Sequence, residues 1–457
     1  MMATLHLSKG GYLVFAKGAV EEVLKKCTHI FSGSKSVPLD EKGRRKWLEV
    51  SENFAALGMK VIGGAYKEAR SENTSLTEDL TFAGVFSLMD PPAKDVVGAI
   101  EECKHAGIHV VMITGDHPAT AKYIAVQLGI SGEEEIPILG KDMSAYEHLT
   151  KHEKQAWLKA SIFARVSPSN KLDLVKVLQK NGNIVGMTGD GVNDAPALKK
   201  ADIGIAMGIR GTQVAQEAAD MVLKDDAFSS IVFAIRQGRI IFTNIQKFVA
   251  FLLSCNLSEI FVVSVVALSN LHFQLVPLQI LFINLVTDMF PALALSLSGG
   301  DAFVMNHPPR NPKTPILDKK QWYGVWIHAA VISVCTLLAV YISHTFFHTG
   351  TQFDPVLCNN ILFFTLILSQ LFHVFNMSAP GTSFFKNEVF RNKYIWYSHL
   401  ICGLILVLIF YIVPIRSALK IKDLLPEDWL VIVGSSLLSL IIIQGIKLFG
   451  KVEKAPK

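Results

Sequence analysis

The chain has 457 residues, of which half are hydrophobic and 18% are charged, and its formal net charge is +5. This length suffices for two or three domains, and such a small, dispersed positive charge argues against a nucleic-acid partner. The six cysteines show neither paired nor metal-type spacing, which favours a reduced cytosolic or membrane-buried setting over a disulfide framework.

The pattern of strands and helices in residues 1–88 predicts part of an α+β domain. Residues 4–7 and 12–16 predict a hairpin that turns at Lys9-Gly10-Gly11, and a helix follows it. Lys17 and Gly18 stand between the second strand and that helix, where a glycine permits close approach of a ligand. Taken alone, this pair is more often an ordinary turn.

Residues 89–238 predict an α/β domain that is entered through a rigid turn, Asp90-Pro91-Pro92. Strand and helix signals alternate along it, which implies right-handed crossovers and a doubly wound parallel sheet. The expected elements are a helix at 96–106, a strand at 109–113, a helix at 119–128, a strand ending near Ala164, a strand at 183–187, a strand at 201–207 and a helix at 212–223.

Polar residues follow two of these strands. Thr114, in Thr114-Gly115-Asp116, would offer a hydroxyl and neighbouring amides to phosphate oxygens in a phosphoryl-transfer site. Residues 163–168 end another strand, and Lys171 follows one helical turn later. A lysine there would neutralise charge on a phosphoryl group. By itself Lys171 would be an ordinary surface lysine.

The stretch from Met187 to Pro196 reads Met-Thr-Gly-Asp-Gly-Val-Asn-Asp-Ala-Pro. We expect Asp194 to be the N-cap of a helix with Pro196 in its first turn. Asp190 and Asp194 are then held where a strand meets a helix N-terminus, which is the usual ligand crevice of α/β sheets. Carboxylates beside a phosphate need a divalent cation, and Mg²⁺ suits such oxygen ligands. A lone Gly-Asp-Gly would more often be a capped turn.

Residues 239–451 predict a membrane region, followed by a tail at 452–457. This region contains six apolar stretches, and each is close in length to the ~20 residues that cross a bilayer. The first one continues a helix begun near Ser229, giving a rod of about 40 residues and roughly 60 Å. The distribution of Lys and Arg places both chain ends in the cytoplasm of a multi-pass protein in the plasma membrane or an internal membrane. The stretches are 246–268, 275–297, 324–346, 357–377, 394–415 and 428–448.

Two of the predicted membrane helices carry polar side chains that share a face: Asn256 and Glu259 on the first, and Asn284, Thr287 and Asp288 on the second. An ionised acid at mid-membrane costs about 2.5–3.5 kcal/mol, and neither Glu259 nor Asp288 has a basic partner in its own span. Pro291 frees the carbonyl of Thr287 as a further oxygen ligand. These hard donors favour sodium, potassium, calcium or magnesium. The alternative is polar contact between helices.

The ten-residue motif resembles the hinge motif of P-type cation-transporting ATPases, whose core belongs to the haloacid-dehalogenase-like phosphatases. The resemblance implies that Lys17 and Gly18, in a Lys-Gly-Ala element, contact the ATP base, and that Lys67 and Arg165 serve the nucleotide. Many relatives carry an arginine at the position of Lys67. It also implies a catalytic set in which Asp190 holds Mg²⁺: Thr114, Gly115, Asp116, Lys171, Asp190, Asn193 and Asp194.

The membrane helices resemble the calcium-pump branch of this family. Residues 255–259, 277–280 and 283–288 match its ion-ligating helices, and the sodium/potassium branch usually has an acid where Asn284 stands. The resemblance therefore favours Ca²⁺ as the transported cation. Gln370 occupies a position where two-site calcium pumps place a glutamate, so we expect it to be a weaker ligand.

The resemblance covers only the later half of a whole pump, and the phosphorylation motif Asp-Lys-Thr-Gly-Thr does not occur in the chain. In the family that aspartate lies on a central strand, so two strands here would face an empty slot with unpaired edges. We expect the chain alone neither to be phosphorylated nor to pump. It would be a truncated product, a fragment, or half of a split pump whose partner chain supplies the actuator domain and the first four helices. Two competing hypotheses are a non-catalytic membrane subunit and, with less support, a membrane-anchored phosphatase.

Overall fold

The computed structural model describes residues 1–8, 10–33, 35–89, 91–269, 273, 275–300, 303–348, 353–379 and 383–452. The chain divides into two compact units, Met1–Ala234 and Ile235–Lys457. This division falls close to the predicted start of the membrane region at 239. Lys9 of the predicted hairpin turn, Asp90 of the predicted domain junction and the tail at 453–457 lie outside the described residues.

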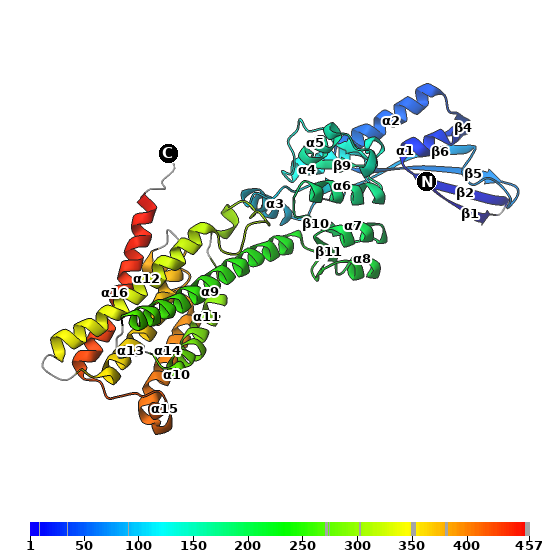
Figure 1. Ribbon diagram of the computed structural model, residues 1–457. Helices are drawn as coiled ribbons and strands as arrows, with labels where there is room; N and C mark the ends of the chain where they lie inside the picture. The colour runs from blue at the N-terminus through cyan, green and yellow to red at the C-terminus, as the bar shows by residue number, and fades with distance from the viewer. Residues whose placement is uncertain are drawn as a thin grey trace. The chain divides into compact units, whose positions relative to one another are not determined.

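A six-stranded sheet opens the first unit, with strand order β1-β2-β5-β6-β3-β4 (Figure 1). Its pairs are antiparallel except for β3 with β6, and β1 with β2 is the predicted hairpin. The helices α1 and α2 pack on β5. The bounds are β1 Met2–Ser8, β2 Gly11–Gly18, α1 Val20–Lys25, β3 Cys27–Ser32, β4 Lys35–Pro38, α2 Glu41–Ala56, β5 Lys60–Ala69 and β6 Leu80–Leu88.

Two three-stranded parallel sheets follow in the first unit, ordered β7-β9-β8 and β10-β11-β12. Consequently β7 and β10, which precede the two predicted phosphate-site motifs, are both edge strands of their sheets. Ile113 of β7 packs against the cluster that contains Met187 of β10, so the two edges lie near each other. The bounds are α3 Val96–His105, β7 Met112–Ile113, α4 Pro118–Gln127, β8 Ile138–Leu139, α5 Lys151–Lys159, β9 Ile162–Ala164, α6 Pro168–Lys180, β10 Gly186–Gly189, α7 Ala195–Lys200, β11 Ile203–Met207, α8 Gln213–Ala218 and β12 Met221–Leu223.

Several predicted boundaries in this region were wrong. The strand expected at 183–187 begins only at Gly186, because Val185 N–H donates to the Asp202 side chain at 2.8 Å instead of joining the ladder. The Val185 carbonyl accepts from Asp202 N–H and from Ile203 N–H at the start of β11. The helix expected at 212–223 ends at Ala218, and β12 then pairs with β11. The strand expected at 109–113 is reduced to Met112–Ile113.

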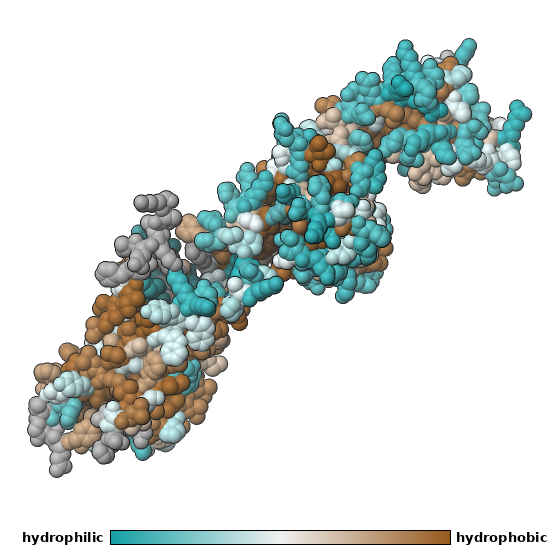
Figure 2. All heavy atoms as spheres, turned by 45° about the horizontal axis from the view of Figure 1, so that its top comes forward, coloured by the Kyte–Doolittle hydropathy of each residue, from teal (hydrophilic) through white to brown (hydrophobic). Residues whose placement is uncertain are grey.

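The second unit is helical, and six helices of the described residues are long and apolar enough to cross a membrane. Their surface is largely hydrophobic, whereas the surface of the first unit is largely hydrophilic (Figure 2). The first helix, α9, has 41 residues, so it spans about 60 Å as predicted. The six are α9 Phe228–Leu268, Pro277–Ser296 (α10, η4 and α11), Lys319–Phe347 (α12 and η6), Pro355–Met377 (α13 and η7), α14 Lys393–Tyr411 and Pro426–Leu448 of α16.

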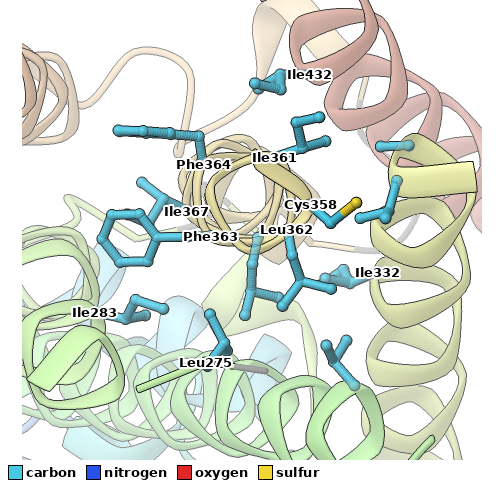
Figure 3. Close-up of a cluster of buried hydrophobic side chains, with 14 of the residues drawn as sticks. Leu275, Ile283, Ile332, Cys358, Ile361, Leu362, Phe363, Phe364, Ile367 and Ile432 are labelled. Carbon is cyan, nitrogen blue, oxygen red and sulfur yellow. The ribbon is translucent and has the colours of Figure 1, made fainter. Parts of the chain in front are cut away.

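The helix α13 (Pro355–His373) is the centre of this bundle. Nearly every residue between Cys358 and Leu371 is buried, and its side chains contact neighbours on several sides, including Ile283, Ile332 and Ile432 (Figure 3). A helix that is apolar all round and buried all round must be enclosed by other helices. Gln370, predicted as a weak ligand, is therefore presented inside the bundle.

Proline sets two interruptions in the membrane helices. The stretch predicted at 394–415 ends at Tyr411, because Pro414 cannot continue an α-helix and instead lies in the first turn of a short separate helix, α15 (Val413–Ala418). In the second span, Pro291 follows a π-helical segment, η4 (Ile283–Asp288). Segments of this kind are frequent at functional sites.

A buried ion pair ties α9 to the segment between α13 and α14. Lys247 Nζ lies 2.6 Å from Glu388 Oε1, and the two side chains are only 10% and 6% exposed. Ala379 N–H donates to the same carboxylate at 2.7 Å. Burial opposes ionisation of Glu388, but the charge and hydrogen bond of Lys247 prevail and lower its pKa below the ordinary value.

Replacing Phe82 by alanine should destabilise the first unit by about 3–5 kcal/mol, the usual cost of removing a buried Phe ring. Phe82 is fully buried and packs edge-to-face on Trp47 at 5.4 Å, so tryptophan fluorescence during urea unfolding measures the effect. Phe86 lies on the same strand and is 65% exposed. Phe86→Ala is thus the matched control and should change stability little; equal losses in both variants would contradict this packing.

Candidate functional site

The turn after β7 presents Thr114, Gly115 and Asp116. Thr114 Oγ1 donates to Asp116 Oδ2 and accepts from Asp116 N–H, both at 3.1 Å. Gly115 is exposed, and a Cβ placed on it would meet nothing within 4 Å. The turn is thereby held in one conformation, with open space beside Gly115.

A second turn, after β9, is bonded to the first one. Arg165 N–H donates to Asp116 C=O and Val166 N–H donates to Thr114 C=O, each at 3.2 Å. Arg165 has a φ of 53°, which is uncommon for a residue with a side chain and is found at functional sites. Its guanidinium reaches Glu21 Oε1 at 2.7 Å. The 165–166 turn thus connects the 114–116 turn to Glu21 in α1, the helix that follows β2.

The helix α6 begins at this turn and brings Lys171 to Asp194. The Lys171 Nζ to Asp194 Oδ1 distance is 2.6 Å, and the side chains are 19% and 10% exposed. Gly189 makes room for the pair, because a Cβ at Gly189 would lie 2.6 Å from Asp194 Cβ. Asp194 is the N-cap residue of α7 and Pro196 lies in the first turn, as predicted, but the Asp194 side chain makes no capping bond because Lys171 holds that carboxylate.

Asp190 and Asn193 lie in the same loop and are both exposed. The Asp190 carbonyl accepts from Thr212 N–H at 2.8 Å, which fixes the backbone and leaves the carboxylate facing solvent. The predicted catalytic residues therefore form a connected set: the 114–116 turn bonds to 165–166, α6 carries Lys171, and Lys171 binds Asp194 in the Asp190 loop. The exposed Asp190 beside the buried Lys171–Asp194 pair fits a magnesium ion.

A cavity of about 480 Å³ opens next to the 114–116 turn. The sequence-predicted residues Lys17, Gly18, Asp116 and Arg165 all line it. Lys67 does not: the β2–β5 register pairs Lys17 with Gly64 and Val14 with Lys67, so the two lysines lie on opposite faces of the sheet. Lys67 Nζ instead donates to Glu78 C=O at 2.8 Å.

Sequence reasoning missed two titratable residues of this cavity, Lys60 and His117. Lys60 Nζ lies 3.4 Å from Asp116 Oδ1. His117 accepts from Ala119 N–H at the start of α4, and burial together with the nearby Arg165 charge lowers its pKa. Only His117 had a signal, since it precedes Pro118 at a predicted helix start. No local pattern in the sequence marks Lys60, because it lines the cavity only through the position of β5 in the folded sheet.

A second cluster lies among the membrane helices. Glu259, buried on α9, accepts two amide hydrogen bonds: one from Gln370 Nε2 to Oε1 at 3.2 Å and one from Asn284 Nδ2 to Oε2 at 3.0 Å. Thr287 Oγ1 donates to Ile283 C=O at 2.9 Å, so its lone pairs stay available. The structure therefore brings together Glu259, Asn284 and Gln370 from three helices.

Asp288 is fully buried, and neither of its carboxylate oxygens has a hydrogen-bond partner among the described residues. Gln370 Oε1 is likewise without a partner in this part of the chain. Buried polar atoms of this kind are rare and need an explanation. Asn256, in contrast, is exposed and donates to Leu252 C=O within its own helix at 2.8 Å.

A cation held here would depend on amide, hydroxyl and carbonyl oxygens besides the two acids. Across the described ranges, no three His, Cys, Asp or Glu side chains lie close enough to hold a metal ion by themselves. This oxygen-rich set has the chemistry of a hard-cation site rather than of a zinc-type site.

Two family models match the chain. The model described as "P-type ATPase, cytoplasmic domain N" matches residues 1–95, which contain the six-stranded sheet. The model described as "Cation transporting ATPase, C-terminus" matches residues 272–449, which contain five of the six membrane-type helices. Along the chain, the two matched ranges lie before and after the residues of the parallel sheets.

Curated relatives match almost the whole chain. A protein named "Calcium-transporting ATPase 1" from Bacillus cereus is 39% identical over 99% of this chain and 52% of the relative. "Calcium-transporting ATPase" from Bacillus subtilis is 37% identical over 94% of this chain and 48% of the relative. The chain thus spans about half the length of these relatives. It is a multi-pass membrane protein, and it belongs to the P-type cation-transporting ATPases, in their calcium-pump-like branch.

Proposed function

We propose that this chain is the part of an ATP-driven calcium transporter that binds the transported ion and the nucleotide. The single observation that carries the proposal is the buried Glu259–Asn284–Asp288–Gln370 cluster, in which both Asp288 oxygens lack hydrogen bonds among the described residues. The names of the curated relatives support calcium as the ion. A magnesium-dependent phosphoryl transfer would be coupled to movement of this ion.

Ca²⁺ would be bound by oxygens of this cluster and its neighbours. Glu259 and Asp288 supply the charge, and Thr287 supplies a hydroxyl and a carbonyl freed by Pro291. A half turn of the terminal amide of Asn284 or Gln370 exchanges its nitrogen for its oxygen. The amides can therefore stabilise the Glu259 carboxylate in one orientation and contribute oxygens to a cation in the other. Asn256 would have to change rotamer to join them.

The phosphate site of the first unit would act as a haloacid-dehalogenase-like site. Asp190 would hold Mg²⁺, which neutralises phosphate charge, and Lys171 would do the same from the other side. Asp194 orients Lys171 through their 2.6 Å contact. Thr114 and the amides of its turn would bind phosphoryl oxygens, with Asn193 next to them. Lys17, Gly18 and Arg165 would hold ATP in the adjoining cavity.

The 41-residue helix α9 carries Glu259. Its movement would couple phosphoryl transfer in the first unit to ion binding at Glu259. With 41 residues, α9 is about twice as long as the ~20 residues that cross a bilayer, so part of it would extend into the cytoplasm as a stalk. The positive-inside distribution of Lys and Arg supports cytoplasmic chain ends. We place the protein in the plasma membrane or an internal membrane on this basis.

A second candidate function follows from the edges of the two parallel sheets. β7 and β10 are edge strands that lie near each other, and an extended segment between them would complete one parallel sheet. Such a segment could come from a separate chain with the phosphorylatable aspartate, the actuator domain and the first four helices. This chain would then be one half of a split pump, and alone it would be a non-catalytic membrane subunit.

Replacing Glu259 by Gln and Asp288 by Asn should weaken calcium binding by the purified chain about tenfold or more, a loss of about 1.4 kcal/mol, because both charges are removed. Isothermal titration of the chain in lipid nanodiscs measures it. Asp428→Asn is the matched control, since Asp428 is equally buried at another place in the bundle. Unchanged affinity in the double variant, or an equal loss in the control, would refute the site.

Arg165→Gln should weaken binding of a fluorescent ATP analogue at least tenfold, because a charge-assisted hydrogen bond contributes about 1.5–3 kcal/mol. The same change should raise the pKa of His117, since the Arg165 charge is one of the two causes that lower it. An NMR titration of the His117 ring measures this shift. Lys35→Gln, an exposed site in the same unit, is the control. A normal affinity together with a raised His117 pKa would remove Arg165 from the nucleotide site.

Incubation with γ-labelled ATP should leave the purified chain without acid-stable phosphate, because Asp-Lys-Thr-Gly-Thr does not occur in it. Adding a second chain that carries this motif tests the split-pump candidate. Labelling of the added chain, and its co-purification with this one, would support that candidate. Strong labelling of this chain alone would contradict the proposal.

A further inference from the structure

One surface of the helical unit combines exposed cations with exposed aromatic rings. It lies between the end of the fourth membrane-type helix and the first turns of α14, and we call it the 385–397 patch. Phe385 is 67% exposed, and Lys386 next to it is exposed as well. The other exposed members are Arg391, Lys393, Tyr394, Trp396 and Tyr397.

The three cations of the patch have no acidic partner among the described residues. Glu388 is the acid within the segment, but its buried carboxylate is taken by Lys247 at 2.6 Å. None of Lys386, Arg391 and Lys393 forms an ion pair within the ranges that the structure describes. The segment therefore presents three positive charges that the surrounding protein does not neutralise.

Basic residues in the loop between α14 and α16 behave differently. Arg416 pairs with Asp423 at 2.7 Å, and Lys422 pairs with Asp354. The helical unit thus compensates two cations of that loop internally while leaving those of the 385–397 patch open. A charge that costs self-repulsion and gains no internal partner points to an external anion.

The aromatic rings of the patch are held in place. Phe385 packs edge-on against Phe390 at 5.3 Å, and Phe390 packs against Trp396 at 5.2 Å. Trp396 Nε1 donates to Phe390 C=O at 2.8 Å. Phe384 and Phe375 extend the cluster into the interior. An ordered aromatic group of this kind, exposed where membrane helices end, suits the headgroup region of a bilayer.

We propose that the 385–397 patch binds anionic phospholipid headgroups. The exposed rings lie among the headgroups, and Lys386, Arg391 and Lys393 contact the lipid phosphate and the additional negative group of a lipid such as phosphatidylserine. The patch anchors the segment between the fourth and fifth membrane-type helices. The inference needs only the membrane character of the chain, so it stands whether or not the chain binds calcium or ATP.

The test uses the full chain in nanodiscs of phosphatidylcholine with or without phosphatidylserine. Electron paramagnetic resonance of spin-labelled phosphatidylserine and phosphatidylcholine gives the preference for the anionic lipid. The variant Lys386→Gln/Arg391→Gln/Lys393→Gln should lose most of that preference, since each basic residue near an anionic surface contributes about a fivefold preference. Phe385→Ser should reduce the number of motionally restricted lipids of both kinds.

The control removes the same charge elsewhere on the helical unit, by Lys313→Gln/Lys319→Gln/Lys420→Gln, at three exposed lysines. This control should keep the preference. An equal loss in both triple variants would show a diffuse charge effect and overturn the proposal, as would an unchanged preference in the patch variant. A patch that bound an acidic protein segment instead would show no lipid preference in the unaltered chain. Thermal unfolding in phosphatidylcholine alone verifies that the variants fold.

Discussion

The buried carboxylate of Asp288 imposes the strictest requirement on the helical unit. It is fully buried, and its oxygens have no hydrogen bond among the described residues. An uncompensated charge in such surroundings costs several kcal/mol, so a proton or a cation must balance it. The surrounding structure is polar: the helix that carries Asp288 changes to a π segment, Pro291 removes a donor from its backbone ladder, and the amides of Asn284 and Gln370 bond to the second acid, Glu259.

In the first unit, a buried carboxylate is balanced by the protein itself. Asp194 is also nearly buried, but Lys171 compensates it directly at 2.6 Å. Since that pair is internally neutral, the exposed Asp190 remains as the acid that can take a metal. Arg165, whose backbone is held in the left-handed region by bonds to the 114–116 turn, adds positive charge beside the cavity. The two sites thus differ in whether the protein supplies the counter-charge.

Predictions from the sequence were correct where a single local pattern, such as a turn, a helix start or a long apolar run, determines the structure. The β1–β2 hairpin, α4, the 41-residue α9 and the placement of Thr114, Lys171 and Asp194 in one connected set are of this kind. Features decided by distant partners were not predictable. Asp202 shortens β10 because its side chain accepts the hydrogen bond from Val185 N–H. The β2–β5 register places Lys67 and Lys17 on opposite faces of the sheet. Lys60 lines the cavity only because β5 begins next to it. Asn256 and Glu259 are three residues apart, yet only Glu259 is enclosed, because the helices packed around α9 decide which side is covered.

The Lys247–Glu388 pair has a mechanical consequence. Separating two desolvated opposite charges leaves each without its partner, a penalty of about 3–5 kcal/mol. A screw-like displacement of α9 at this level must therefore carry the residues around Glu388 with it. Any force delivered along that helix is shared with the segment between the fourth and fifth spans before it arrives at Glu259, so the proposed ion site would be pulled through two connections at once.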